Sequence, residues 1–164
     1  MEGLEREIVG LLPRLRRFAR ALTAAPADAD DLVQQTLERA LTRRGQWRPG
    51  TRLDSWMFRI MKNAWIDETR ARRRQGGLFA PAEEGERVGD DGAGAMETRL
   101  AAAEVARAMA RLPDEQRLAV ALVLVEGLSY QEAAEVLEIP AGTLTSRLVR
   151  GRMALIADLA EMRS

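Results

Sequence analysis

The segment from Ile139 to Arg152, IPAGTLTSRLVRGR, carries hydroxyl and guanidinium groups at positions that a helix would place together. Its apolar residues Leu144 and Leu148, with Met153 just beyond, indicate a buried stripe at helical spacing. The polar residues off this stripe are Thr143, Thr145, Ser146, Arg147 and Arg150. Short hydroxylated side chains let a helix approach a groove closely, and arginine can fork onto guanine or neutralise phosphate. The pattern favours a helix that reads duplex DNA; the alternative is an ordinary solvated face.

A second polar group lies on one face of an earlier predicted helix. Its residues recur three or four apart: Arg59, Asn63, Asp67 and Arg70, with Lys62 beside them and Arg70, Arg72, Arg73 and Arg74 at the helix end. Cations at a helix C-terminus can be purely structural. Three tryptophans, Trp47, Trp56 and Trp65, lie in or beside this segment, however. Aromatic rings among cations suit unstacked single-stranded bases, although we expect at least Trp56 to be mostly core.

The composition removes most catalytic chemistry, because the chain has no cysteine and no histidine. Disulfides, thiolate or imidazole metal sites and the usual histidine base are excluded with them. The cluster Asp28, Asp30 and Asp31 has no evident partner ligands and is more typical of a helix start than of a cation site. We find no Walker loop and no nucleophile elbow. We therefore expect no enzyme activity, no cofactor and no metal.

The chain also lacks membrane signals. Its start, MEGLEREIVG, has neither the basic flank nor the apolar run of a signal peptide. The longest apolar run, from Leu118 to Val125, is far shorter than the about 20 residues that span a bilayer. We expect a cytoplasmic protein without membrane insertion.

The elements that must position these residues are helices. Leucine and alanine supply most of the apolar content and β-branched residues are few, which favours an all-α fold. We expect two small helical bundles, residues 1–75 and 97–164, joined by a flexible acidic linker over residues 76–96 that is rich in glycine. Residues 1–74 hold 16 basic and 10 acidic side chains, so the first unit carries the positive charge although the whole chain is neutral.

Periodicity and end signals give the expected helices. The first unit should hold a buried helical face over residues 4–22, then helices over about 28–41 and 54–74. In the second unit we expect helices over about 97–111, 113–127, 129–137 and 142–160. SYQE, from Ser129 to Glu132, matches a capping box, and Glu138, Ile139 and Pro140 form a tight turn. Two short helices joined in this way are typical of a helix-turn-helix.

Three segments in this order resemble a known family: DADDLVQQTLERAL, then WRPGTRLDSWMFRIMKNAWIDETRARRR, then LPDEQRLAVALVLVEGLSYQEAAEVLEIPAGTLTSRL. They are similar to bacterial sigma factors of the extracytoplasmic function class, and the first unit is similar to the general stress sigma factors of alphaproteobacteria. The resemblance covers nearly the whole chain apart from the linker. It implies that the first unit is sigma domain two, the second is sigma domain four, and the protein is a promoter specificity subunit without catalysis of its own.

The resemblance also implies roles for particular residues. Those matching the segment that binds core RNA polymerase are Asp31, Leu32, Gln34, Gln35, Leu37 and Arg39. Those expected at the minus 10 element are Trp47, Arg59, Lys62, Asn63, Arg70, Arg73 and Arg74, with Asn63 at a position associated with base capture. Those expected in the minus 35 major groove are Thr143, Thr145, Ser146, Arg147 and Arg150. An anti-sigma factor is expected as a further partner.

This chain departs from the family pattern at three positions. Thr145 stands where lysine is usual, Gly151 where alanine is typical, and Leu53 where an aromatic residue is common. A promoter sequence therefore cannot be borrowed from relatives. Two alternatives remain open: a sigma mimic that only occupies an anti-sigma factor, and a stand-alone helix-turn-helix repressor. The retained cations Arg59, Lys62 and Arg70, with Asn63, argue against the mimic, and the tryptophans beside them are unexplained by a repressor.

Overall fold

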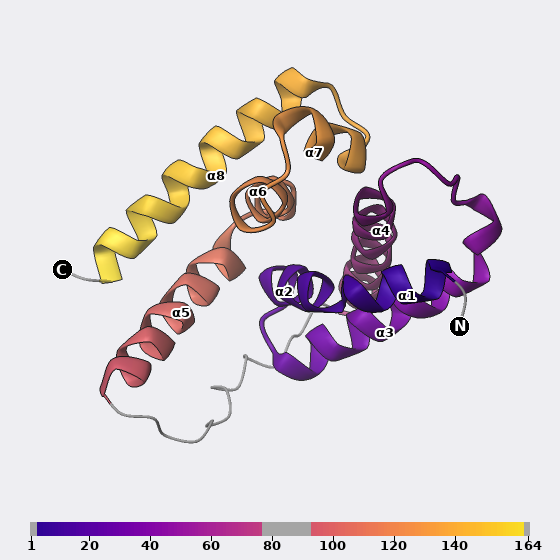
Figure 1. The fold of residues 1–164 in the computed structure, drawn as a ribbon. Coiled ribbons are helices and arrows are strands. Elements are labelled where there is room, and N and C mark those ends of the chain that lie inside the picture. Colours follow the sequence, from indigo (N-terminus) through magenta and orange to yellow (C-terminus); the bar gives the residue numbers. More distant parts are fainter. Residues whose placement is uncertain (1–2, 77–92, 163–164) are drawn as a thin grey trace.

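The computed structural model describes residues 3–76 and 93–162, which contain helices and no strand. The first unit comprises α1 (Gly3–Gly10), α2 (Leu12–Leu22), α3 (Pro26–Thr42), the short 3-10 helix η1 (Arg44–Gln46) and α4 (Leu53–Arg74). The second comprises α5 (Ala93–Arg111), α6 (Asp114–Val120), the π-helix η2 (Ala121–Val125), α7 (Tyr130–Leu137) and α8 (Ala141–Met162). The all-α prediction is confirmed, and Figure 1 shows α5 to α8 arching beside the packed helices α2, α3 and α4.

An aromatic contact fixes α4, the helix that carries the cations Arg59 to Arg74, against α2. Phe18 and Phe58 are almost completely buried, and their rings meet edge to face with centroids 5.1 Å apart. A pair in this geometry adds about 0.5–1.5 kcal/mol beyond the burial of its area. The guanidinium of Arg14 lies over the Phe58 ring at 5.2 Å. The face of α4 that lies away from α2 and α3 is therefore held in a defined direction.

The first apolar stripe is divided between two helices. The sequence indicated one buried face over residues 4–22, but α1 ends at Gly10 and α2 starts at Leu12. The reason is Pro13, in the first turn of α2, because proline has no amide hydrogen to donate to the preceding turn. The amide of Leu11 closes α1 on the carbonyls of Glu7 and Ile8, at 3.2 and 3.0 Å.

In the second unit the helix-turn-helix forms as expected. Ser129 accepts a hydrogen bond from the Glu132 amide, and the Glu132 carboxylate accepts one from the Ser129 amide, so the capping box is confirmed. Helix α7 ends at Leu137, and the φ of 59° at the next residue, Glu138, places it in the left-handed region that turns the chain towards α8. The predicted linker, residues 76–96, lies mostly outside the described residues, and α5 begins at Ala93 rather than near residue 97.

The buried stripe of α8 differs from the expected one in its second half. It runs through Leu144, Leu148 and Gly151 to the partly buried Leu155, whereas Met153 is 66% exposed. The prediction that Met153 belongs to the stripe is wrong, because spacings of three and four from Leu148 lead to Gly151 and Leu155. Gly151 lets α8 approach α6 closely: a Cβ atom there would lie 2.9 Å from Cγ2 of Val120.

The two units pack directly against each other. Helix α2 contacts α5, α6 and η2, and α4 contacts α7. Charged groups span this seam, since Arg17 binds Glu126, Arg73 binds Asp114, and Arg117 donates to the carbonyl of Ala21 at 2.7 Å. Within residues 3–76 and 93–162, no helix combines the length and the hydropathy that crossing a membrane requires.

Candidate nucleic-acid interface

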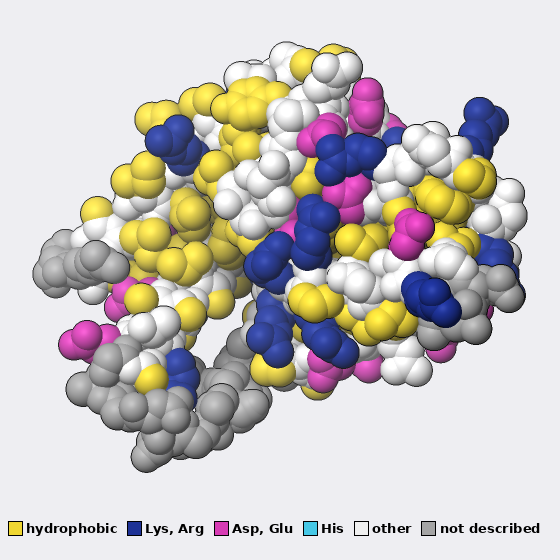
Figure 2. Space-filling model, viewed as in Figure 1, with side chains coloured by type: hydrophobic (Ala, Val, Ile, Leu, Met, Phe, Trp, Pro, Cys, Tyr) yellow, Lys and Arg dark blue, Asp and Glu magenta, His cyan; other side chains and the backbone are white. Residues whose placement is uncertain are grey.

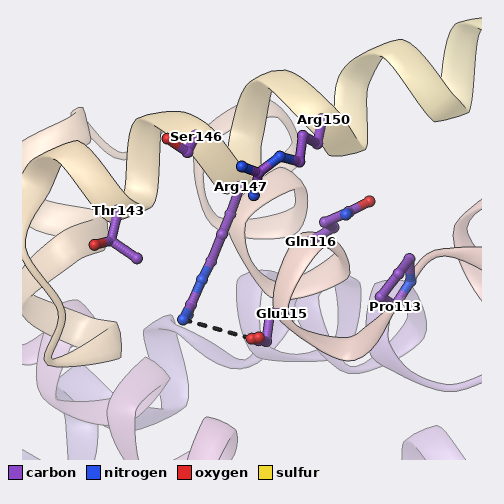
Figure 3. Close-up of a pocket in the computed structure, with 7 residues that line it drawn as sticks. All are labelled: Pro113, Glu115, Gln116, Thr143, Ser146, Arg147 and Arg150. Carbon is purple, nitrogen blue, oxygen red and sulfur yellow. Dashed lines mark ion pairs between the residues drawn. The ribbon is translucent and has the colours of Figure 1, made fainter.

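Helix α8 presents the proposed duplex-reading residues beside α6. Ser146 and Arg150 are exposed, and Thr143, Thr145 and Arg147 are partly buried. The Thr145 hydroxyl donates to the carbonyl of Ala141 at 3.0 Å, one turn earlier in its own helix. Figure 3 shows Arg147 reaching from α8 down to Glu115 of α6, while Arg150 projects from the next turn of α8. The Nη2 atom of Arg147 lies 3.5 Å from Oε2 of Glu115.

A pocket of about 390 Å³ lies between these two helices. Its lining residues are Pro113, Glu115, Gln116, Thr143, Ser146, Arg147 and Arg150 (Figure 3). Hydroxyl, amide and guanidinium groups here can all donate hydrogen bonds to base edges or phosphate oxygens. The Glu115 carboxylate holds Arg147 in place without neutralising Arg150, which forms no ion pair with any described residue.

The candidate strand-binding residues of α4 fall into two groups. Arg70 and Arg74 are exposed and form no ion pair within the described parts of the chain, and Asn63 is partly exposed. Arg59, Lys62 and Arg73 face the second unit. Nη2 of Arg59 donates to the carbonyl of Glu135 at 2.9 Å, and Arg73 pairs with Asp114 at 2.7 Å. Lys62 is only 5% exposed, with Nζ 3.5 Å from a Glu138 carboxylate oxygen.

The three tryptophans occupy different environments. Trp65 is 5% exposed, on the same face of α4 as Phe58 and Met61. Trp56 is partly buried and packs against the core cluster, as expected. Its position lies about 100° around the helix from the stripe that contains Met57. Trp47 is also partly buried, and its indole Nε1 is enclosed without a hydrogen-bond partner among the described residues.

The candidate polymerase-binding residues lie along α3. Asp31 and Gln34 are exposed, Gln35 and Leu37 are partly buried, and Arg39 pairs with Asp67 of α4 at 3.2 Å. Leu32 has no exposed surface, because it faces the core of the first unit. Leu32 therefore positions α3 and is not available for direct contact with a partner, which corrects the sequence-based expectation.

A network of ion pairs that the sequence did not reveal connects the two units. The Arg17 guanidinium binds both carboxylate oxygens of Glu126, at 2.9 and 3.0 Å, and the Arg14 guanidinium lies 3.6 Å from the same group. Arg14 also donates to Asp54 at 3.0 Å. The Glu126 side chain is completely buried. Helix α2 has four arginines in eleven residues, but this composition does not indicate which of them pair across the seam.

The network continues at the start of α4 and α7. Arg52 binds both Asp54 and Glu132, so it joins the first helix of the helix-turn-helix to the first unit. Burial opposes ionisation of Asp54, but hydrogen bonds from Arg52 and Arg14 outweigh it and lower the pKa of this carboxyl. The Ser129 amide lowers the pKa of Glu132. Donation of hydrogen bonds to Glu126 raises the pKa of Arg17, and donation to Asp54 raises the pKa of Arg52.

Arg117 is a buried cation at the same seam. It is 8% exposed, and its burial lowers the pKa of its guanidinium to about 10. Its Nε donates to a carbonyl in the last turn of α2, where a helix carries partial negative charge. Arg117 therefore caps a helix of the first unit from the second, a role that local sequence signals did not indicate.

A helix-turn-helix with an exposed polar recognition helix, beside a basic helical unit with partly buried tryptophans, defines a protein that reads DNA. Comparisons with known proteins specify the class. The family model described as the Sigma2 domain of PhyR matches residues 8–62, and the model described as Sigma-70, region 4 matches residues 102–155.

Two curated relatives and one solved structure match most of the length of this chain. The ECF RNA polymerase sigma factor EcfG of Rhodopseudomonas palustris is 35% identical over 162 residues, covering 96% of this chain and 86% of its own length. SigM of Mycobacterium tuberculosis is 38% identical over 142 residues, covering 87% of this chain and 69% of its own. The sigma factor RpoE of Bartonella quintana, in complex with the anti-sigma factor NepR, has a TM-score of 0.84 at 29% identity over 98% of each chain. The chain belongs to the ECF RNA polymerase sigma factors.

Proposed function

We propose that this chain binds core RNA polymerase and directs promoter recognition, promoter opening and transcription initiation. The observation that carries the proposal is the presence of two separate DNA-reading surfaces, on α4 and α8, in a member of the sigma factor family. The protein adds specificity to the polymerase and contributes no catalysis of its own. Its place of action is the cytoplasm, where the polymerase works.

The two units divide the work. Residues 1–75 act as sigma domain two and residues 97–164 as sigma domain four, joined by residues 76–96. Helix α8 enters the minus 35 major groove with Thr143, Thr145, Ser146, Arg147 and Arg150. The non-template strand of the minus 10 element lies along α4, held by Trp47, Arg59, Lys62, Asn63, Arg70, Arg73 and Arg74. Opening DNA costs stacking energy, which cations and aromatic rings offset by binding the extruded strand.

Two further surfaces suit protein partners. The exposed residues of α3, among them Asp31 and Gln34, are offered to core polymerase together with Gln35, Leu37 and Arg39. Apolar side chains on α5 and α8, among them Leu100, Met153 and Ile156, are more than half exposed. Figure 2 shows apolar side chains gathered over these two helices, a property of surfaces that bind other proteins. We propose an anti-sigma factor as a regulatory partner, supported by the RpoE complex with NepR.

Transcription from purified components tests the proposed function. Core polymerase supplied with this chain should produce transcripts from a subset of promoters on a genomic template, and sequencing them would reveal the promoter. A sharper test is Asn63→Ala, with Gln75→Ala at the exposed end of α4 as the control. Promoter opening should fall much more than initial duplex binding in Asn63→Ala. An equal loss in both steps refutes the role of Asn63, and the absence of promoter-dependent transcripts refutes the function.

The match of residues 8–62 to the family model described as the Sigma2 domain of PhyR supports a second candidate function, that of a mimic that only occupies an anti-sigma factor. Such a mimic needs the helical surfaces but not the cations of α4. The same transcription assay separates the two, because a mimic would bind an anti-sigma factor without producing transcripts.

A further inference from the structure

The first helix of the helix-turn-helix lies across the cations of α4. Glu132 pairs with Arg52, the carbonyl of Glu135 accepts from Arg59, and Glu138 pairs with Lys62. Glu132 and Glu135 are three residues apart on α7 and Glu138 caps its end, so the three acceptors follow one another along the helix. Asp114 at the start of α6 extends the row by pairing with Arg73 at 2.7 Å.

Three of the four cations that the second unit contacts, Arg59, Lys62 and Arg73, are among those proposed to hold the non-template strand. Lys62 is 5% exposed and Nε of Arg59 is enclosed without a partner in the described residues, so Lys62 and this nitrogen of Arg59 are closed to a phosphate in this arrangement, whereas Arg73 remains largely exposed. Arg70 and Arg74, farther along α4, are exposed. The second unit thus covers the part of α4 nearest α7 and leaves its C-terminal end accessible.

The recognition helix is not covered in the same way. Ser146 and Arg150 of α8 are exposed while Lys62 of α4 is buried. The duplex-reading surface is therefore accessible in an arrangement that covers part of the strand-binding surface. A surface that supplies carboxylates and a carbonyl to cations presents the same acceptor chemistry as a nucleic-acid backbone.

We propose that the acidic side of α7, extended by Asp114, is an intramolecular docking surface for α4 that single-stranded DNA must displace. The inference rests on the proposed function, because it takes the strand-binding role of α4 from there. Strand binding and contact between the two units compete for Arg59, Lys62 and Arg73, because the acceptors of α7 and α6 lie against these cations where a phosphate would have to approach.

The exposed ion pairs of the docking surface can break and re-form. Glu138 is 61% exposed and Arg73 is 61% exposed at their side chains, and ion pairs at such exposure are individually modest. Removing two of the acids should shift the balance between docked and separated units by about two- to tenfold. The apparent affinity for a strand should tighten by the same factor, because it is proportional to the fraction of molecules in the separated, binding-competent state.

The test uses the full-length chain without polymerase and a labelled single-stranded DNA of mixed sequence. The variant is Asp114→Asn with Glu138→Gln, which leaves Glu132 in its capping box. The matched control is Glu97→Gln with Glu161→Gln, two exposed acids of α5 and α8 that change the net charge equally. The chain has no cysteine, so Thr42→Cys and Ala154→Cys, both exposed, allow two dyes to report the separation of the units by energy transfer.

We expect the interface variant to bind the strand two- to tenfold more tightly than the native sequence, with lower energy transfer before any DNA is added. Saturating DNA should lower energy transfer in the native sequence, since the coupling is reciprocal. Equal tightening by the control pair, or unchanged energy transfer at saturation, overturns the inference while strand binding itself stands. No binding of the strand by either variant overturns the strand-reading role of α4 as well.

Discussion

Adding one methyl group at Gly151 should destabilise this protein, although the same change is favourable at most helical glycines. A Cβ atom at Gly151 would lie 2.9 Å from Cγ2 of Val120, 3.1 Å from Cβ of Gln116 and 3.3 Å from the Gln116 carbonyl oxygen. Val120 is buried and Gln116 Cβ is fixed to a helix backbone, so neither has room to retreat. Inserting a methyl group into packing of this kind costs about 1–3 kcal/mol.

Helix propensity acts in the opposite direction, since alanine in a helix interior is favoured over glycine by about 0.5–1 kcal/mol. We therefore expect Gly151→Ala to lower the free energy of unfolding by about 1 kcal/mol. For a chain of this size that corresponds to a fall of about 2–4 °C in the thermal midpoint. Circular dichroism at the helical band during heating and during urea titration measures both quantities.

Two further variants test whether the clash with Val120 causes the loss of stability. Gly142→Ala, in the first turn of α8, meets nothing within 4 Å and should be neutral or stabilising. In a Val120→Ala background, Gly151→Ala should cost much less, because the nearest atom of the clash has been removed. If Gly151→Ala raises the midpoint as Gly142→Ala does, the close approach of α6 and α8 is wrong. If the Val120 background leaves the cost unchanged, the clash has been assigned to the wrong atoms.

Three further changes test other parts of the structure. Thr145→Lys should tighten binding to a minus 35 duplex and steepen the logarithmic salt dependence by about 0.9, because it adds one cation at the groove; an unchanged slope in fluorescence anisotropy would place position 145 away from the phosphates. The pKa of Asp54 is lowered, so its stabilisation is present above its unfolded value of about 3.8 and is lost as the pH falls through the folded value. Urea unfolding at pH 5 and pH 3.5 should therefore show a smaller acid loss for Asp54→Asn than for the native chain, and equal losses would contradict the assignment. Glu126→Gln should cost about 2 kcal/mol, and a double-mutant cycle with Arg17→Ala should give a coupling energy of at least about 1 kcal/mol; a coupling near zero would show that the pair does not join the units.

Local signals predicted the helix ends well. The capping box at Ser129 and Glu132 needs only residues three apart, and Gly127 supplies the positive φ of 77° that ends the preceding helix. The break at Leu11 was missed although its cause, Pro13, is visible in the sequence: the apolar spacing continues across it and concealed the loss of an amide donor. Helix ends that depend on residues close to them in the chain can therefore be predicted from the sequence.

Contacts between the units have no such signal. Glu126 and Lys62 look like surface residues by type, since charged groups are seldom buried without partners. Their partners, Arg17 and Glu138, are 109 and 76 residues away. Burial of Lys62 follows only from how α7 lies on α4, which no periodicity within either helix specifies. The candidate DNA-binding residues could be named from sequence, but which of them are covered could not.

Because of the π-helical turn at Ala121–Val125, the contacts between the two units depend on how many residues this turn contains as well as on which residues they are. The Glu126 amide reaches back five residues to the carbonyl of Ala121, at 2.9 Å, so this turn contains one residue more than an α-helical turn. Deleting any one of the five would rotate the following side chain by about 100° about the helix axis. Glu126 would then turn away from Arg14 and Arg17, without any change in the residues outside this turn. Single-residue insertions and deletions in this short apolar run are therefore the genetic changes by which related proteins would most readily lose or alter the coupling between their two units.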